Sequence, residues 1–138
     1  LQVIASEDVG LAYPMAAVIT RSCCQSAKEL GLPEARIPLG MAAVMLATAP
    51  KSNTAYLAVN AAAEDIKAGR GTAVPEHLRS PKFEGYVYPH DFVNDYVPQE
   101  YLPRDLAGRR YYNFGDNTVE AAAAAYWAKV KSEKPKRK

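Results

Sequence analysis

The stretch Leu39-Gly40-Met41-Ala42-Ala43-Val44-Met45-Leu46-Ala47-Thr48 would form a helix that is apolar almost all round. A helix without a polar face is normally buried at the centre of a protein. The stretch is far shorter than the roughly 20 residues that cross a bilayer. Pro50 follows and ends the helix, since proline removes a backbone donor. The stretch therefore predicts a core helix over about residues 38–48.

Helices are also predicted on both sides of this core helix. Within residues 14–30, apolar residues recur at three- and four-residue spacing, and Gly31 supplies a C-terminal cap. The same spacing predicts a helix over about residues 53–68. Asp116-Asn117 can cap a last helix over about residues 118–131. Residues 1–138 are thus expected to form a single all-α domain, a helical bundle.

Residues 72–117 differ from the rest, because they hold five of the ten prolines and six of the nine tyrosines. Disordered segments are poor in aromatic residues, so we expect an irregular arm that lies across the helices. The tyrosines expected to dock it are Tyr86, Tyr88, Tyr111 and Tyr112. Candidate partners for their hydroxyl groups, chosen by nearness in sequence, are Asp91, Asp95, Asp105 and Arg109.

No catalytic, cofactor-binding or metal-binding set is evident in the sequence. His90-Asp91 has no nucleophile in a recognisable context, and we expect it to fix the arm after Pro89. The adjacent Cys23 and Cys24 point in different directions on a helix, so we expect two small core residues and neither a disulfide nor a metal site. No apolar run is long enough for a membrane span.

Two strings are candidates for binding anions or DNA. Lys51-Ser52-Asn53 stands at a predicted helix start, where free N–H groups attract an anion, but plain capping of the helix is the favoured interpretation. Arg109-Arg110-Tyr111-Tyr112 could grip single-stranded DNA by charge and stacking, or its tyrosines could be buried with one arginine paired to an acid. The chain from Lys129 onward carries a charge of +5 within a total of +2, and we expect this tail to be a solvated end, with phosphate contact as the alternative.

Several strings resemble one family in a fixed order along the chain. They are Ala5-Ser6-Glu7-Asp8-Val9-Gly10-Leu11-Ala12, Ala47-Thr48-Ala49-Pro50-Lys51-Ser52-Asn53, Val74-Pro75-Glu76-His77-Leu78-Arg79, Tyr88-Pro89-His90-Asp91, Tyr101-Leu102-Pro103 and Gly108-Arg109-Arg110-Tyr111-Tyr112. Together they are similar to the C-terminal region of the bacterial replication-associated recombination protein A family, also called MgsA. The Werner helicase-interacting protein is the family's eukaryotic relative.

The resemblance implies an all-helical domain, similar to the clamp-loader collar, that holds a AAA+ ATPase together as a homotetramer. It implies a role at stalled replication forks in the bacterial cytoplasm, at the nucleoid. The implied partners are further copies of the chain, its own AAA+ domain, DNA and single-strand-binding protein. The Gly-rich phosphate loop that cradles ATP and Mg²⁺ in this class is absent from these residues, so no enzyme activity and no cofactor are expected here. The chain starts at Leu1, without Met, and is expected to be a piece of a longer protein.

Overall fold

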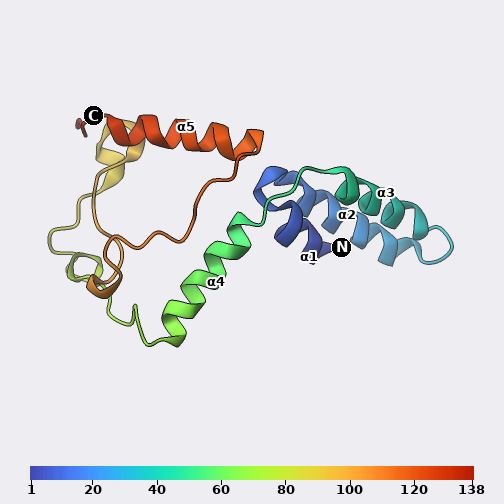
Figure 1. Cartoon of the computed structure of the whole chain (residues 1–138), viewed down its shortest axis with the longest axis horizontal. Helices are drawn as coiled ribbons and strands as arrows, with labels where there is room; N and C mark the ends of the chain where they lie inside the picture. The colour runs from blue at the N-terminus through green and yellow to red at the C-terminus, as the bar shows by residue number, and fades with distance from the viewer. The chain divides into compact units, whose positions relative to one another are not determined.

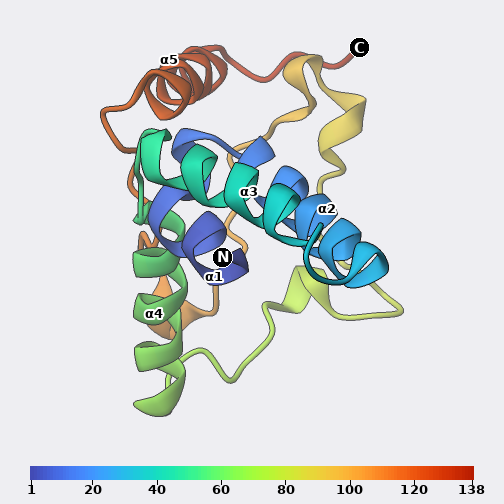
Figure 2. The ribbon, with the colours of Figure 1, turned by 90° about the vertical axis from the view of Figure 1, so that its right-hand side faces the viewer.

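The apolar stretch forms one arm of a helical hairpin. The structure, a computed structural model, describes residues 1–138. Helix α2 spans Met15–Leu30 and helix α3 spans Arg36–Thr48, against the expected ranges 14–30 and 38–48. The two helices lie side by side in both ribbon views (Figures 1 and 2). Gly31, at φ 68°, ends α2 as the expected cap, and its N–H donates to the carbonyl of Ala27.

Only one face of α3 is buried. Ala42 and Leu46 are 0% and 3% exposed and face the core. On the other face Ile37, Met41 and Val44 are 67%, 57% and 64% exposed. The prediction of a helix buried all round is therefore wrong for the single chain. The reason is that too few elements pack on α3 to enclose both of its apolar faces.

The N-terminal residues fill the remaining side of the hairpin's core. Helix α1, Gln2–Ile4, continues into a wider turn over Ala5–Val9 and a 3-10 turn over Gly10–Ala12. The buried cluster joins this segment to both hairpin helices and consists of Ala5, Val9, Ala16 and Leu46. Ala5 and Ala16 in this cluster are small, which allows the backbones of the N-terminal segment and α2 to lie close together.

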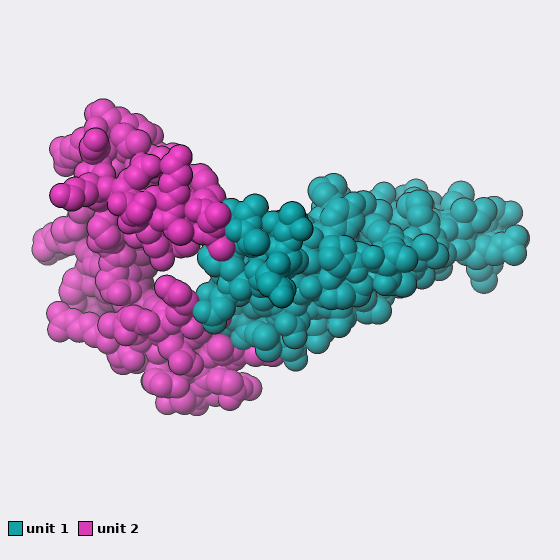
Figure 3. Space-filling view, turned by 45° about the horizontal axis from the view of Figure 1, so that its top comes forward, with its two compact units in different colours: residues 1–59, 112–123 teal, residues 60–111, 124–138 magenta.

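The chain divides into two compact units, coloured separately in Figure 3. Unit 1 comprises residues 1–59 and 112–123, and unit 2 comprises residues 60–111 and 124–138. Helix α4, Thr54–Lys67, and helix α5, Thr118–Ser132, each contribute residues to both units.

Residues 72–117 contain no helix longer than a single turn. Their regular structure is limited to four 3-10 turns: Glu76–Leu78, Pro89–Asp91, Val93–Asp95 and Arg104–Leu106. The chain has five α-helices and no β-strand, since its only extended pairing is an isolated bridge between Phe92 and Arg137. The predicted all-helical class is confirmed. None of the helices combines the length and the hydropathy that a bilayer-spanning segment needs.

The basic tail returns to the arm within unit 2. The backbone N–H of Lys138 donates to the carbonyl of Asp91 at 2.8 Å, and that of Val93 donates to the carbonyl of Lys136 at 2.8 Å. The Lys138 ammonium also pairs with Asp95 at 2.6 Å. The tail was expected to be a solvated end. Apart from the buried Val130, its side chains are exposed, but the backbone near its end is hydrogen-bonded to the arm.

Candidate functional site

A buried carboxylate, Glu120, collects donors from three separate segments of unit 1. Glu120 is 1% exposed and lies in the first turn of α5. The hydroxyls of Ser52 and Thr54, at the start of α4, both donate to it, the second at 2.6 Å. The Tyr112 phenol donates at 2.8 Å and the Gly115 N–H at 3.1 Å. The carboxylate thus ties the beginnings of α4 and α5 to the end of the arm.

These donors determine the charge state of Glu120. Burial by itself raises the pKa of the carboxyl group, but the hydrogen bonds from Ser52, Thr54 and Tyr112 outweigh it and lower the pKa from 4.5 to about 2. Burial and the neighbouring carboxylate raise the pKa of Tyr112 to about 12. Glu120 is therefore a charged carboxylate that is stabilised by hydrogen-bond donors and not by a cation.

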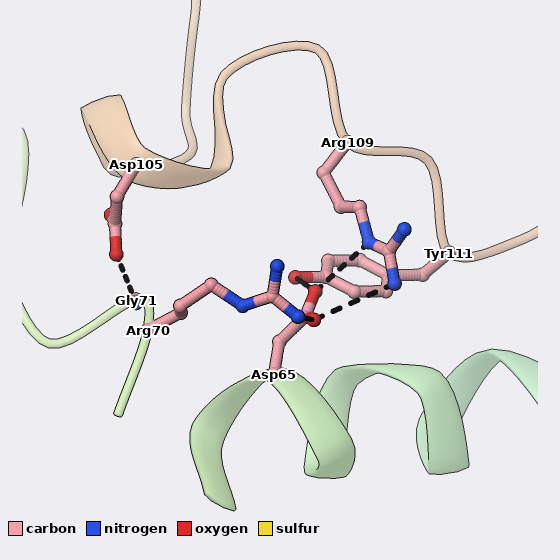
Figure 4. Close-up of polar contacts among 6 residues, drawn as sticks. All are labelled: Asp65, Arg70, Gly71, Asp105, Arg109 and Tyr111. Carbon is pink, nitrogen blue, oxygen red and sulfur yellow. Dashed lines mark hydrogen bonds and ion pairs between the residues drawn. The ribbon is translucent and has the colours of Figure 1, made fainter. Parts of the chain in front are cut away.

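A second buried carboxylate, Asp65, organises unit 2 (Figure 4). Asp65 is 1% exposed and lies near the C-terminal end of α4. The Arg109 Nε and the Tyr111 phenol each donate to its Oδ2 at 2.9 Å. A second guanidinium, that of Arg70, donates to Oδ1. The end of the arm is thereby joined to the end of α4.

The surroundings of Asp65 shift two pKa values in opposite directions. Burial raises the pKa of the Asp65 carboxyl group, but the bonds from Tyr111 and Arg109 outweigh it, and the net pKa lies below 3.8. Burial and the adjacent carboxylate raise the pKa of Tyr111 above 10.0. Both groups therefore keep the charge states that the hydrogen bond between them requires.

In the string Lys51-Ser52-Asn53, the candidate anion site, the first two side chains form hydrogen bonds within the chain. The Lys51 ammonium donates to the carbonyls of Ala47 and Ala49, which capping of the preceding helix explains. Ser52 donates its hydroxyl to Glu120. Asn53 is exposed. The anion at this helix start is thus the carboxylate of Glu120.

A groove opens beside this string within unit 1. Its volume is about 640 Å³, and apolar side chains of α1 and α3 form most of its wall. The lining residues are Leu1, Ile4, Asp8, Ala43, Leu46, Ala47, Lys51, Ser52 and Asn53. The groove therefore combines an apolar floor with a polar edge.

The candidate string Arg109-Arg110-Tyr111-Tyr112 is largely engaged inside the chain. Arg109 and Tyr111 donate to Asp65, and Tyr112 donates to Glu120. Arg110 is exposed and makes no ion pair. The expected hydroxyl partners were wrong, because the acids that bind the tyrosines lie outside the arm. Tyr88 is 54% exposed and has its ring against His90, with 5.2 Å between ring centroids, so it does not dock onto a helix.

The exposed face of α3 carries a row of large apolar side chains. Ile37, Met41 and Val44 follow one another at i, i+4 and i+7, which places them on one side of the helix. Leu32, in the turn before α3, is 84% exposed. We call these four residues the α3 stripe. Such a pattern is the one an amphipathic helix normally presents to a core.

Comparison with known proteins supports a family assignment. The family described as MgsA AAA+ ATPase C terminal matches residues 1–131. Replication-associated recombination protein A of Bacillus subtilis is 44% identical over 121 residues, covering 81% of this chain and 29% of that protein. The Escherichia coli protein of the same name is 37% identical over 119 residues, covering 79% of this chain and 27% of that protein.

A more distant relative is the ATPase WRNIP1 of Dictyostelium discoideum, 30% identical over 80% of this chain and 14% of that protein. The chain thus spans less than a third of each of these relatives. The match covers the C-terminal region of the family, and no ATPase domain is evident in it. The chain belongs to the MgsA AAA+ ATPase C-terminal family, whose members include replication-associated recombination protein A.

Proposed function

We propose that this chain joins copies of a AAA+ ATPase to one another, as a homotetramer with a role similar to that of a clamp-loader collar. The observation that carries the proposal is the α3 stripe. Removing apolar surface from water is favourable, and monomeric proteins seldom leave a large contiguous patch exposed. A second copy would cover the stripe without any change in the fold of the single chain.

The exposed area is of the right size for such a contact. Eight large apolar residues of the hairpin are at least 36% exposed: Met15, Val18, Leu30, Leu32, Ile37, Leu39, Met41 and Val44. At roughly 50 Å² each they present on the order of 400 Å² of apolar surface. A standard interface buries about 800 Å² on each partner, somewhat more than half of it apolar. The hairpin can supply most of that apolar share.

A second apolar patch favours a tetramer over a dimer. A tetramer with two-fold symmetry uses two different self-complementary faces. Unit 1 also has a shallow apolar groove of about 510 Å³ between its N-terminal residues and α4, lined in part by Val3, Tyr56 and Val59. These three side chains are 69%, 40% and 63% exposed. We assign this groove to the second interface.

The mass of the chain in solution tests the proposal. The monomer has a mass of 15.0 kDa, so a tetramer has about 60 kDa. Light scattering on the chain, after size-exclusion chromatography, is expected to give the tetramer mass at tens of micromolar, where an interface of this size is stable. A mass of one chain throughout that range would refute the assembly role.

Alternative roles rest on fewer observations. Stacking of DNA bases on Tyr111 and Tyr112 is the second candidate, but both hydroxyls hold buried acids, so we propose docking of the arm as their main role. ATP and Mg²⁺ are proposed to bind the ATPase domain of the longer protein. We place that protein in the cytoplasm at the nucleoid, with DNA, its own AAA+ domain and single-strand-binding protein as proposed partners.

A further inference from the structure

A cavity of about 630 Å³ lies within unit 2, between two separate segments of the arm. Residues 72–79 form one wall and residues 100–107 form the other. Each wall contains a single 3-10 turn that follows a proline, Glu76–Leu78 in the first wall and Arg104–Leu106 in the second. Ligand pockets in proteins have volumes of about 300–1,000 Å³, and this cavity is of that size. The α3 stripe lies in unit 1, so the cavity is separate from the surface proposed for assembly.

Hydrogen bonds at the ends of the two walls hold the cavity in shape. The Gly71 N–H, immediately before the first wall, donates to Oδ2 of Asp105 in the second wall at 2.8 Å. Asp65 accepts from Arg70, which precedes the first wall, and from Arg109, which follows the second. Figure 4 shows both links. The walls therefore have a fixed spacing, and a preformed site avoids the cost of ordering loops when a ligand binds.

The uncharged part of the lining suits an aliphatic residue and its peptide group. Four apolar side chains line the cavity, two from each wall: Val74, Pro75, Leu102 and Pro103. Val74 is 54% exposed in the chain, so an aliphatic side chain placed against it removes apolar surface from water. His77 also lines the cavity, and its Nε2 is buried without a hydrogen-bond partner. Such an atom is unfavourable, and a peptide group of a ligand carries both a donor and an acceptor that satisfy it.

The charged side chains around the cavity leave an excess of negative charge. Glu76 and Arg79 pair with each other at 2.9 Å. The other charged groups of the lining are Glu100 and Asp105, against Arg104. Each of these two carboxylates takes one backbone N–H at one oxygen, Glu100 at 3.1 Å and Asp105 at 2.8 Å. A carboxylate has about four acceptor sites, so the cavity attracts a cation and has acceptors left for its N–H groups.

The arm is acidic beyond the cavity, and it already holds a basic segment. Residues 72–107 carry six Asp and Glu residues against three Lys and Arg residues, a net charge of −3. Outside the cavity, the Lys138 ammonium pairs with Asp95 at 2.6 Å and the Lys138 N–H donates to the carbonyl of Asp91 at 2.8 Å. This part of the arm thus holds a basic segment through a cation and a backbone bond together. The cavity offers the same two kinds of contact to a segment of another protein.

We propose that the cavity binds a short segment of a partner protein in which a lysine or arginine stands beside an aliphatic residue. The long stem of either cation packs along apolar walls while its charged end stays near solvent, where the exposed Glu100 and Asp105 lie. The neighbouring aliphatic side chain covers Val74, and the peptide group between the two residues bonds to Nε2 of His77. These contacts are independent of the assembly role, because none of them involves unit 1.

Binding of two small probes to the isotope-labelled 138-residue chain, followed by nuclear magnetic resonance, tests the proposal. The probes are N-acetyl-leucyl-arginine amide and its acidic counterpart, N-acetyl-leucyl-glutamate amide. We expect saturable binding of the arginine probe at millimolar concentrations, with the largest shifts in the backbone signals of residues 72–79 and 100–107. Absence of such binding overturns the proposal. Equal or tighter binding of the glutamate probe also overturns it, because the cavity would then belong to an acidic partner.

Glu100→Gln is the decisive variant, because its amide keeps an oxygen for the Leu102 N–H but removes the charge. An exposed ion pair contributes up to about fivefold in affinity, so we expect the arginine probe to bind about threefold to fivefold more weakly. Glu84→Gln is the matched control, since Glu84 is an acid of the same arm that is 80% exposed and does not line the cavity. It should leave the affinity unchanged, and equal effects of the two variants would count against the proposal.

Ala73→Trp tests the cavity itself, since Ala73 is one of its lining residues and a large ring there fills the space. The variant should lose binding of the arginine probe and keep the melting temperature and the mass of the unaltered chain. Binding at unaltered strength would contradict the proposal. A smaller mass at an unaltered melting temperature would assign the cavity to a second copy of the chain and overturn the partner protein as its occupant. If Ala73→Trp does not fold, the comparison of Glu100→Gln with Glu84→Gln decides.

Discussion

Tyr112 donates its phenolic hydrogen at 2.8 Å to Glu120, a residue that is 1% exposed and lies eight positions further along the chain. The preceding residue, Tyr111, makes the equivalent bond at 2.9 Å to the buried Asp65. Two neighbouring tyrosines thus hold two different buried acids, one in each unit of the chain. This arrangement makes the end of the arm a determinant of stability.

Removing the hydroxyl of Tyr112 should destabilise the fold. Tyr112→Phe leaves the ring in place but takes one donor from a charged, buried acceptor, and such a bond contributes about 1.5–3 kcal/mol. Tyr112→Ala should cost roughly 3–5 kcal/mol, because the ring is lost as well. Urea unfolding followed by circular dichroism gives both values.

Tyr88→Phe is the control for this prediction. Tyr88 is 54% exposed, so the removal of its hydroxyl should leave the free energy of unfolding unchanged. Equal stabilities of Tyr112→Phe and Tyr88→Phe would show that the bond to Glu120 adds nothing.

The stability of the chain should fall in acid because of Glu120. The pKa of this carboxyl group is lowered in the folded chain from 4.5 to about 2. A group with a depressed folded pKa contributes stability that is complete above its unfolded pKa and is lost as the pH falls toward its folded pKa. We therefore expect the midpoint of urea unfolding to decrease between about pH 4.5 and 2. Asp65, whose pKa is also lowered, acts in the same direction.

Glu120→Gln isolates the contribution of this one carboxylate. One carboxylate oxygen becomes an NH₂ group, which cannot accept a hydrogen bond. At least one buried donor then has no acceptor, and each such donor costs about 1–3 kcal/mol of stability. The variant should be less stable at pH 7 and should lose less stability in acid than the unaltered chain. Glu84→Gln, at a side chain that is 80% exposed, should change neither quantity. A pH profile of Glu120→Gln that matches the unaltered chain would assign the acid sensitivity to other groups.

The sequence predicted features that depend on neighbouring residues. The apolar spacing indicated the all-helical class, and Asn117 was expected to cap the last helix. The structure confirms the cap, since the Glu120 N–H donates to the Asn117 Oδ1 at 3.0 Å. An acid three residues after an N-cap is also a known local pattern, the capping box. It could have indicated a structural role for Glu120, but not which distant groups would reach it.

Contacts between distant residues could not be predicted in the same way. Ser52 lies 68 residues from Glu120 and Arg109 lies 44 residues from Asp65, and no local spacing relates the members of either pair. The outward face of α3 was missed for a related reason. An apolar helix has the same sequence whether its own chain or another copy covers it.

Gly10 should tolerate substitution less well than Gly31. Both have positive φ, 46° and 68°, so alanine is strained at either position. A Cβ on Gly10 would also lie 2.3 Å from the carbonyl oxygen of Ser52, whereas a Cβ on Gly31 meets no atom within 4 Å. Gly31→Ala should cost about 1–3 kcal/mol, because φ 68° with ψ 177° is a conformation that essentially only glycine adopts. Gly10→Ala should cost clearly more stability, because the backbone at Ser52 must move. Thermal melting of the two variants measures the difference, and equal losses of melting temperature would contradict the prediction.

The contribution of the α3 stripe to assembly can be measured with two isoleucines of nearly equal exposure. Ile37 lies in the stripe at 67% exposed, and Ile66 lies in unit 2 at 68% exposed. A lysine at an interface buries an unpaired charge, whereas a lysine on a free surface does not. The most direct measurement is the mass by light scattering of Ile37→Lys and Ile66→Lys at equal concentration. We expect a smaller assembly for Ile37→Lys and an unchanged one for Ile66→Lys. Retention of the mass of the unaltered chain by Ile37→Lys would contradict the assembly role.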